Sequence, residues 1–471
     1  MRKTKIICTI GPASESEAVL TKLCLAGMNV ARLNFSHGSH EEHFKKMSTI
    51  KKVREALNLP IAIMLDTKGP EFRIKTFEGG KITLQDGDPF TFTARDVKGN
   101  QEEVSISYPG LVNDLEAGDT ILLNNGLLSF QVEKIQGKDI HCTTKIGGVL
   151  SDRKSMSFPG KILSQPYLSE QDKQDILFGI ANEVDYIACS FVSCAKDLDA
   201  VRDFLHANGG DDIALIAKIE NQPGVDNIEE ICRRCEGIMI GRGDMGVEIP
   251  FEQLPAIQKQ LITKCRLLGK RVITATEMLE SMIYNPRPTR AEISDVANAV
   301  YDGTSAIMLS GESAMGKYPV EAVATMSKIA EWTEQAIDFK SRFHSNQFEI
   351  HNIIDAISHA TCGMAIDINA KAIVACSLSG GTVRLVSRFR PPMDIVGLTT
   401  NKKTWRKLAL SWGVTPIMCE ELPSTEVLFY TAKKLAQSAL GLTTGDRIVI
   451  TGGVTNGTSG NTNLIKVEQY T

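Results

Sequence analysis

The stretch Ile213-Ala214-Leu215-Ile216-Ala217-Lys218-Ile219-Glu220 decides the fold of this chain. It is an apolar run that ends in two charged residues, Lys218 and Glu220. Such a continuous apolar run is typical of a parallel strand that is covered on both faces. Residues i and i+2 of a strand share a face, so these two side chains should point the same way. The segment therefore predicts a strand of a parallel sheet with an ammonium and a carboxylate at its carboxyl end.

The next apolar run, Gly237–Asp244, ends in a second charged triplet, Arg242-Gly243-Asp244. We read it as a strand that presents Arg242 and Asp244 on one face. Two carboxylates with open positions suit Mg²⁺ held together with a substrate oxyanion. A neighbouring Lys and Arg suit a phosphate or a developing enolate. The alternative is a buried salt-bridge network without function, which the repetition at two successive strand ends disfavours.

Apolar runs of this kind alternate with amphipathic segments along much of the chain. The expected strands are Lys5–Ile10, Val30–Phe35, Ile61–Thr67, Asp185–Phe191, Ile213–Glu220, Gly237–Asp244, Arg271–Thr276 and Ala306–Gly311. The expected helices are Ser14–Ala26, His40–Leu57, Ser169–Asn182, Ala195–Ala207, Val225–Cys235, Leu254–Leu268, Ala291–Tyr301 and Val320–Ile337. Ser14 and Glu17 have the spacing of a capping box at the start of the first helix. Eight β-then-α units predict an α/β protein built on a (β/α)₈ TIM barrel.

Two regions depart from this alternation. Residues 70–166 contain short alternating runs separated by turn signals such as Asp86-Gly87-Asp88 and Asn124-Asn125-Gly126. They predict an inserted small β-barrel, placed as a lid on the face where barrel active sites form. The catalytic barrel would then comprise residues 1–69 and 167–341. Residues 342–471 have too few units for another barrel and predict a C-terminal open α/β domain.

Composition sets the broad class of the protein. Of 471 residues, 42% are hydrophobic and 23% are charged, as in an ordinary soluble globular protein. The net charge of −4 gives no general attraction for nucleic acid. No apolar run is long enough to span a bilayer, and no signal peptide is visible. The 11 cysteines are irregularly spaced and lie mostly in apolar segments, so a cytoplasmic location is expected.

Polar side chains also follow other barrel strands. Arg32, Asn34 and Ser36 share one face at the end of the second strand, and Asp66 and Thr67 follow the third. Oxygen ligands from Asn34, Ser36, Asp66 and Thr67 would form a hard-cation site of low charge. Such a site suits a monovalent ion better than Mg²⁺.

Three motifs point to other functions. Gly241-x-Gly243-x-x-Gly246 matches a dinucleotide fingerprint, but no helix is expected after it to bind the phosphates. The segment 311–317 nearly matches a P-loop, yet Tyr318 stands where Ser or Thr should bind Mg²⁺. A P-loop NTPase is therefore the alternative with a different mechanism. Cys232-x-x-Cys235 lacks a second Cys pair and lies on an expected helix, which disfavours zinc or redox chemistry.

The C-terminal domain has a candidate anion site of its own. Ser377-Leu378-Ser379-Gly380-Gly381-Thr382 joins an expected strand to an expected helix. Hydroxyls, two glycines and a helix N-terminus can bind a phosphate. Arg384 would add charge from the first turn of that helix, and the glycine-rich segment 452–460 is placed to close over it. The alternative is an ordinary turn.

Five motifs together resemble pyruvate kinase. They are Asn34-Phe35-Ser36-His37-Gly38, Leu65-Asp66-Thr67-Lys68-Gly69-Pro70-Glu71, Lys218-Ile219-Glu220-Asn221, Gly241-Arg242-Gly243-Asp244-Met245-Gly246-Val247-Glu248 and Asn285-Pro286-Arg287-Pro288-Thr289-Arg290-Ala291-Glu292. The resemblance runs in order from Thr4 to the C-terminus and is closest to the bacterial form. It implies transfer of the phosphoryl group of phosphoenolpyruvate to ADP, giving ATP and pyruvate through a Mg-stabilised enolate.

The resemblance also implies roles for individual residues. Arg32 and Lys218 would contact the phosphoryl group, Lys218 would face the enolate oxygen, and Thr276 would lie near the carbon that is protonated. Arg242 and Gly243 would complete the catalytic and substrate-binding set. The implied ligands are Glu220 and Asp244 for Mg²⁺ (or Mn²⁺), and Asn34, Ser36, Asp66 and Thr67 for K⁺. The implied nucleotide contacts are Asn34, His37, Arg73 and Lys154.

The family pattern further implies a homotetramer and a sugar-phosphate or nucleotide effector at Ser377, Ser379, Gly380, Gly381 and Thr382. Relatives with Lys at the position of Glu71 do without K⁺, so this chain is expected to need it. Three positions depart from the pattern: Asn124-Asn125 replaces two acidic residues, Glu277 replaces a Gln, and Pro223 replaces an acidic residue or Gln. A metabolite-sensing protein without activity is a further alternative, but it would need a missing catalytic residue, and none is missing.

Overall fold

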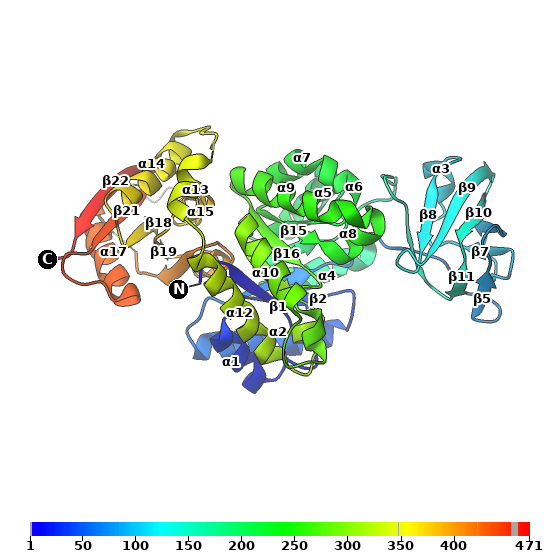
Figure 1. Cartoon of the computed structure of the whole chain (residues 1–471), viewed down its shortest axis with the longest axis horizontal. Helices are drawn as coiled ribbons and strands as arrows, with labels where there is room; N and C mark the ends of the chain where they lie inside the picture. The colour runs from blue at the N-terminus through cyan, green and yellow to red at the C-terminus, as the bar shows by residue number, and fades with distance from the viewer. Residues whose placement is uncertain (1, 347, 422, 454–459) are drawn as a thin grey trace.

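The computed structural model describes residues 2–346, 348–421, 423–453 and 460–471. Its parts lie in a row (Figure 1): the C-terminal domain at one end, the parallel barrel in the middle and the inserted β domain at the other end.

Eight parallel strands form the closed central barrel, in the order β1-β17-β16-β15-β14-β13-β3-β2. Their bounds are Lys5–Thr9 (β1), Val30–Asn34 (β2), Ala62–Asp66 (β3), Tyr186–Cys189 (β13), Ala214–Ile219 (β14), Gly237–Gly241 (β15), Arg271–Ala275 (β16) and Ala306–Leu309 (β17). Their apolar side chains are buried both inside the ring and against the surrounding helices. The predicted TIM barrel is confirmed.

Helices surround the barrel (Figure 1). The longer ones are Glu17–Ala26 (α1), His40–Ala56 (α2), Glu170–Ala181 (α4), Ala195–Ala207 (α5), Leu254–Leu267 (α9), Arg290–Asp302 (α10) and Pro319–Gln335 (α12). The short ones are Gln222–Asp226 (α6), Ile228–Arg234 (α7), Arg242–Glu248 (α8), Phe251–Gln253 (η1), Glu280–Ile283 (η2) and Gly311–Ala314 (α11).

Two details of the expected helices are wrong. The first helix is capped by Ser16, whose side chain accepts a hydrogen bond from the backbone of Val19. Ser14 instead exchanges hydrogen bonds with Gly11 at the end of β1. The single helix expected over 225–235 is two helices, α6 and α7, with Asn227 between them.

The inserted segment between β3 and α4 forms its own apolar core. Its elements are Phe72–Arg73 (β4), Lys81–Leu84 (β5), Pro89–Thr93 (β6), Glu103–Ser105 (β7), Leu111–Asp114 (α3), Thr120–Leu123 (β8), Leu128–Gln136 (β9), Asp139–Ile146 (β10), Gly148–Ser151 (β11) and Ser155–Ser157 (β12). Seven strands form one sheet in the order β4-β12-β8-β9-β10-β6-β7, and β11 pairs with β5. All pairs are antiparallel except β6 with β7.

The C-terminal domain is an open sheet in the order β20-β19-β18-β21-β22, with only β22 antiparallel to its neighbour. Its strands are Ala372–Cys376 (β18), Asp394–Thr399 (β19), Val414–Met418 (β20), Arg447–Gly453 (β21) and Thr462–Gln469 (β22). Its helices are Phe339–Ser345 (α13), Ile353–Asp367 (α14), Gly381–Arg388 (α15), Lys402–Leu408 (α16) and Thr425–Leu440 (α17). The predicted open α/β arrangement is confirmed.

Buried polar contacts join this domain to the barrel. Asp185 precedes β13, and its Oδ1 accepts a hydrogen bond from Nε of Arg406 in α16 at 2.8 Å. Its Oδ2 lies 3.7 Å from Nη1 of Arg54 in α2. The next residue, Tyr186, donates its hydroxyl to the backbone oxygen of Lys407 at 2.5 Å. The amino end of β13 is therefore fixed to the C-terminal domain.

Across the described ranges, the model contains no helix that combines the length and apolar character required to span a membrane.

Candidate active site

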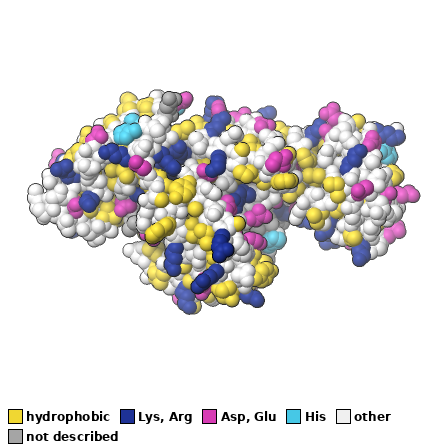
Figure 2. Space-filling view, viewed as in Figure 1, with side chains coloured by type: hydrophobic (Ala, Val, Ile, Leu, Met, Phe, Trp, Pro, Cys, Tyr) yellow, Lys and Arg dark blue, Asp and Glu magenta, His cyan; other side chains and the backbone are white. Residues whose placement is uncertain are grey.

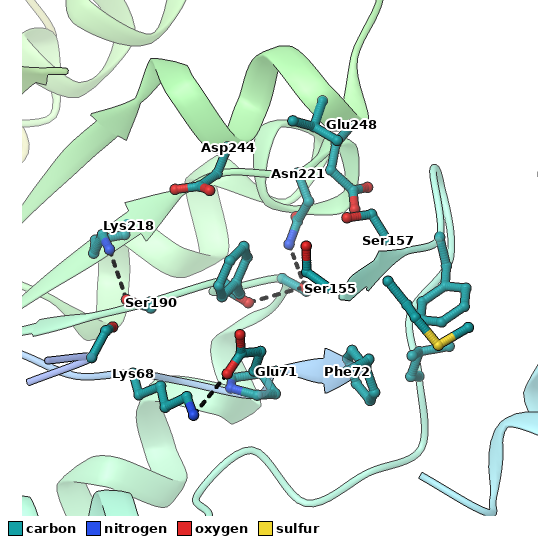
Figure 3. A pocket seen from close by; sticks show the side chains of 18 of the residues that line it. Lys68, Glu71, Phe72, Ser155, Ser157, Ser190, Lys218, Asn221, Asp244 and Glu248 are labelled. Atoms are coloured by element: carbon teal, nitrogen blue, oxygen red, sulfur yellow. Dashed lines mark hydrogen bonds and ion pairs between the residues drawn. The ribbon is translucent and has the colours of Figure 1, made fainter. Parts of the chain in front are cut away.

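A cavity of about 580 Å³ lies at the carboxyl ends of the barrel strands, between the barrel and strand β12 of the inserted domain (Figure 3). We call it the central cavity. Its lining from the barrel includes Arg32, Asn34, Ser36, His37, Ser190, Lys218, Asn221, Asp244 and Glu248. Its lining from the inserted segment includes Glu71, Arg73, Asn125, Ser155 and Ser157.

Lys218 lies between two buried carboxylates at this end of the barrel. Its Nζ is 3.1 Å from Oδ1 of Asp66 and 3.1 Å from Oε1 of Glu220, and it donates to Oγ of Ser190 at 2.7 Å. Burial alone would lower the pKa of Lys218, but the charges of Asp66 and Glu220 raise it above its ordinary value. The predicted shared face of Lys218 and Glu220 is confirmed, and the ammonium stays charged at the cavity wall.

Arg32 is held beside Lys218 by the same Asp66 carboxylate. Its Nε donates to Oδ2 of Asp66 at 2.6 Å and its Nη1 donates to Oγ1 of Thr9 at 2.8 Å. Burial would raise the pKa of Asp66, yet Arg32 and Lys218 lower it. Asp66 therefore positions two cations whose remaining donors can meet an anion in the cavity.

Glu220 is fully buried and fits only because its neighbour in the next strand lacks a side chain. A Cβ at Gly241 would lie 2.6 Å from Oε1 of Glu220. Oε2 accepts from the backbone of Phe191 at 2.8 Å. Burial raises the pKa of Glu220 to about 7, with Lys218 opposing this and Asp244 adding to it.

The strand predicted over residues 237–244 ends earlier than expected. Strand β15 stops at Gly241, and helix α8 begins at Arg242. The i, i+2 rule therefore does not apply, and Arg242 and Asp244 point in different directions. Asp244 lies in the first turn of α8 and lines the cavity, as Figure 3 shows. The expectation that no helix lies at the fingerprint glycines is also wrong, because α8 starts directly after Gly241 and contains Gly243 and Gly246, although it ends at Glu248.

Arg242 is turned toward the end of β16. Its Nη1 is 2.8 Å from Oδ2 of Asp295, and its Nε donates to the backbone oxygens of Ala275 and Thr276 at 3.2 Å each. Thr276 has a left-handed backbone, with φ of 69°. Its Oγ1 accepts from the backbone of Gly243 at 3.0 Å and donates to the oxygen of Ala275 at 2.6 Å. Neither Arg242 nor Thr276 is among the residues that line the central cavity.

The four oxygens expected to bind a monovalent ion are close in the fold but are partly engaged. Asn34 and Ser36 line the cavity, and Oδ1 of Asn34 accepts from the backbone of Ser36 at 3.2 Å. Thr67 donates to the oxygen of Ala188 at 3.3 Å. Asp66 is buried against Arg32 and Lys218, so it would serve such an ion chiefly through its negative charge.

The expected nucleotide residues separate into two groups. Asn34 and His37, together with Arg32, line both the central cavity and a second cavity of about 940 Å³ that extends toward α1, α2 and α11. Arg73 lines the central cavity from the inserted domain. Lys154 precedes β12 and lines neither cavity; its backbone oxygen accepts from Ile74.

Two residues of the cavity were missed in the sequence. Ser190 follows β13 and links Lys218 to the third strand, because its Oγ donates to the backbone oxygen of Thr67 at 2.7 Å. Its position directly after an apolar run was the available signal. Glu248, at the end of α8, faces Ser157 of the inserted domain in Figure 3. Burial raises its pKa to about 7. No sequence pattern marks that contact between domains.

The donor set fits a divalent cation that is completed by a substrate. Within the ranges that the structure describes, no group of three or more His, Cys, Asp or Glu residues forms a complete metal cage. Asp244 lines the cavity, and Glu220 lies behind Lys218 in its wall, where burial raises the pKa of the carboxyl group. Such a site leaves coordination positions for oxygens of a ligand.

The remaining sequence motifs have structural explanations. Cys232 and Cys265 are buried, with their sulfurs 3.5 Å apart. In the segment that resembles a P-loop, Glu312 is buried and accepts from the backbones of Leu279 and Ser310 at 3.0 and 2.7 Å.

The turn at the start of α15 is only partly as expected. Helix α15 does begin at Gly381 after strand β18, and no side chain caps it. Thr382, however, is buried, and its Oγ1 lies 2.5 Å from Oγ1 of Thr462. The side chain of Arg384 lines a cavity shared with the barrel. The segment expected to close over the turn includes residues 454–459, which lie outside the described residues.

Comparison with known proteins agrees with this geometry. The family model described as "Pyruvate kinase, barrel domain" matches residues 1–323, and "Pyruvate kinase, alpha/beta domain" matches residues 355–468. A pyruvate kinase of Clostridium acetobutylicum is 47% identical over 470 residues, covering 99% of each chain. One from Staphylococcus aureus is 47% identical and covers 99% of this chain and 80% of its own. A crystal structure of a Cryptosporidium parvum pyruvate kinase superposes with a TM-score of 0.94 at 39% identity, covering 99% of this chain and 96% of that one. The chain therefore belongs to the pyruvate kinase family of phosphotransferases.

Proposed function

We propose that the central cavity transfers the phosphoryl group of phosphoenolpyruvate to ADP and then protonates the resulting enolate to pyruvate. The observation that carries this proposal is the position of Lys218. It is a charged ammonium held by Asp66, Glu220 and Ser190 at the wall of a cavity that also contains Arg32 and Asp244. Fixed charges of this kind stabilise charge that develops during a reaction.

Substrate binding follows from the same charges. Arg32 and Lys218 bind the phosphoryl oxygens, and Lys218 also faces the enolate oxygen. Glu220 and Asp244 hold Mg²⁺ (or Mn²⁺), which when bound neutralises negative charge on the phosphoryl and enolate oxygens. Gly243 offers a backbone close to the substrate, since it lies in the first turn of α8 beside Thr276.

The two cavities supply the two reactants. Phosphoenolpyruvate occupies the central cavity and ADP the second one, with Arg32, Asn34 and His37 at their junction. The bond between phosphorus and the enol oxygen breaks as a terminal ADP oxygen bonds to phosphorus. Positioning and charge neutralisation provide most of the catalysis in such transfers. Arg73, which lines the central cavity from the lid, would contact the part of the nucleotide that reaches into that cavity. Lys154 lines neither cavity, and its role as a nucleotide contact is a prediction from the resemblance alone.

Protonation of the enolate completes the reaction. Thr276 holds its hydroxyl at a fixed place through Gly243 and Ala275, and Arg242 fixes the backbone of Thr276 from behind. We assign Thr276 to the delivery of a proton to the enolate carbon from solvent. Arg242 then acts as a positioning residue for Thr276, which explains why it faces away from the cavity.

A monovalent cation site and regulation are part of the same proposal. K⁺ would be held by Asn34, Ser36, Asp66 and Thr67, where it would add positive charge to the site. Ser377, Ser379, Gly380, Gly381 and Thr382 form an effector site for a sugar phosphate or nucleotide. A cytoplasmic homotetramer, and domain limits of 1–69 with 167–341, 70–166 and 342–471, remain our predictions.

One assay tests the core of the proposal. The purified protein is mixed with ADP and phosphoenolpyruvate, and pyruvate formation is measured with and without Mg²⁺ and K⁺. We expect activity only with a divalent cation, and stronger activity with K⁺ than with Na⁺. Pyruvate formation by the parent protein but not by Asp244→Asn would support the metal assignment. Full activity in the presence of a chelator would contradict it.

A further inference from the structure

A cavity of about 530 Å³ lies where the C-terminal domain meets the barrel and shares no lining residue with the central cavity. We call it the junction cavity. Five cationic side chains line it: Arg202, Arg233, Arg234, Lys270 and Arg384. Arg384 belongs to helix α15 of the C-terminal domain, whereas the other four belong to the barrel. Figure 2 shows Lys and Arg side chains gathered at the boundary between these two parts.

Two of the five cations are neutralised within the cavity wall. Nη2 of Arg202 lies 3.3 Å from Oε2 of Glu236, and Nε of Arg234 lies 3.2 Å from Oδ1 of Asp199. These are the two carboxylates of the lining. The cavity therefore has three more positive than negative groups.

The other three cations lack a carboxylate partner among the residues that the structure describes. Lys270 donates to the backbone oxygen of Cys235 at 2.7 Å, a neutral acceptor. Arg233 forms no salt bridge within 4.0 Å, and neither does Arg384. Burial lowers the pKa of Arg384 to about 10, and the nearby charge of Arg271 adds to the effect. Arg384 is thus a half-buried guanidinium without an ion pair of its own, whose charge is offset only in part by Glu236, the carboxylate that already pairs with Arg202.

A second cavity at the same boundary has a smaller excess of cations over carboxylates than the junction cavity. It has about 520 Å³ and is also lined by five cations: Lys51, Arg54, Lys402, Lys403 and Arg406. There every cation has a carboxylate within 4.0 Å, for example Oδ2 of Asp212 at 2.6 Å from Lys403. Four carboxylates pair with the five cations of this cavity, whereas only two carboxylates pair with cations in the junction cavity.

We propose that the junction cavity binds a small molecule that carries a phosphate group. A dianion with several acceptor oxygens matches the excess of positive charge, and guanidinium groups bind phosphate through paired N–H donors. The volume suits a small metabolite. Such a ligand contacts the barrel and the C-terminal domain at once.

The test is a titration with inorganic phosphate and with glycerol phosphate, at constant ionic strength maintained with chloride. Unfolding temperature and heat of binding are recorded for the parent, for Arg384→Gln and for Lys403→Gln. Phosphate also binds the central cavity, but that contribution is the same in all three proteins. The comparison of variants therefore isolates the junction cavity.

We expect the parent and Lys403→Gln to respond alike, and Arg384→Gln to bind about tenfold or more weakly at one site, as for the loss of a charge-assisted hydrogen bond. Arg233→Gln, which changes an exposed residue, should weaken the same site by a smaller factor and guards against misfolding of the first variant. Equal titrations of the parent, Arg384→Gln and Arg233→Gln would overturn the proposal. Equal losses in Arg384→Gln and Lys403→Gln would also overturn it, because they would show a general charge effect.

Discussion

The barrel has a buried ionic cluster at each end, and the two clusters differ in what surrounds them. At the carboxyl end, Asp66 contacts both Arg32 and Lys218. At the amino end, Asp185 contacts both Arg54 and Arg406. Each carboxylate is completely buried. In composition, the two clusters are nearly the same.

The two clusters differ in the groups that surround them. The cluster of Asp66 borders a cavity of about 580 Å³ and includes Lys218, whose second carboxylate, Glu220, has a pKa raised by burial to about 7. In the cluster of Asp185, the second oxygen also accepts from the backbone of Ile63 at 2.9 Å. The comparison teaches that buried charge alone does not identify an active site. A neighbouring cavity is not enough either, because Arg54 and Arg406 also line one and burial also raises the pKa of Asp185. The carboxyl end differs in having a lysine between two carboxylates, Asp66 and Glu220, with a third carboxylate, Asp244, in the wall of the same cavity.

The largest effect should follow from removing the ammonium of the carboxyl-end cluster. Lys218→Met should lower kcat by about 10³-fold, because a fixed charge that faces the reacting oxygens is lost. Exchange of the methyl protons of pyruvate with solvent should persist, since Glu220 and Asp244 remain. Steady-state kinetics and proton exchange by NMR measure the two effects. Phosphoryl transfer near the parent rate would remove Lys218 from the mechanism.

The matching change at the amino end should affect stability instead. Asp185→Asn leaves Arg54 and Arg406 buried without a carboxylate, which should cost about 3 kcal/mol of unfolding free energy. The kcat of the folded protein should stay within about twofold of the parent, because Asp185 is remote from the reacting groups. Chemical unfolding and kinetics on the same samples test this. A large loss of kcat without loss of stability would show that the two clusters do not divide function as we describe.

A smaller effect, dependent on pH, should come from Lys5 near the amino-end cluster. Lys5 donates to the oxygen of Val414 at 2.7 Å. Burial, followed by the charge of Arg2, lowers its pKa to about 7. The unfolded chain therefore binds more protons than the folded one between about pH 7 and the ordinary lysine pKa of about 10.4, so stability from this group rises with pH across that window.

Lys5→Met should accordingly be more stable than the parent near pH 7, by about 1–2 kcal/mol. The difference should shrink toward pH 10. Unfolding in denaturant at several pH values measures it, with Lys52→Met, an exposed lysine on α2, as the control. A difference that does not change with pH would mean that Lys5 stays protonated in the fold.

The smallest expected effect is on the activation by K⁺, which we place at the carboxyl end of the barrel. Glu71 lies at the central cavity, 2.7 Å from Nζ of Lys68 and in contact with Arg73. Glu71→Lys places an ammonium there and should reduce the activation by K⁺ several-fold, with activity in Na⁺ retained. Glu71→Gln is the control that removes the carboxylate without adding the ammonium. If both variants keep the full response to K⁺, the charge at this position does not substitute for the ion.

Much of this arrangement followed from the sequence, because parallel strands buried on both faces leave long apolar runs whose ends are polar. The eight barrel strands and the shared face of Lys218 and Glu220 are examples. The start of α8 at Arg242 did not follow, since Arg-Gly-Asp after an apolar run continues a strand as readily as it begins a helix. Contacts between residues distant in the sequence determine that the helix begins there. Gly241 packs against Glu220, and Arg242 donates a hydrogen bond to the backbone of Thr276.

Other features depend on how separate parts of the chain are packed together. Ser190 is one serine after an apolar run, and only the barrel places it beside Lys218. Arg384 was expected to face the turn before α15, whereas the packing of the C-terminal domain turns it toward the barrel. Lys154 carries a charge suited to a nucleotide, but the position of β12 keeps it outside both cavities of the site. The local sequence pattern does not show which distant parts of the chain these residues will contact.

Strand β13 connects the C-terminal domain to the central cavity. Tyr186 at its first residue is hydrogen-bonded to Lys407 in the C-terminal domain, and Ser190, just past its last residue, is hydrogen-bonded to Lys218. Four residue steps of extended chain span about 13 Å. Covalent backbone of this kind resists both compression and stretching, and its neighbours in the closed ring prevent it from bending aside. We therefore expect a displacement of helix α16 to reach Lys218 through the backbone of β13 and the side chains of Tyr186 and Ser190 at its two ends.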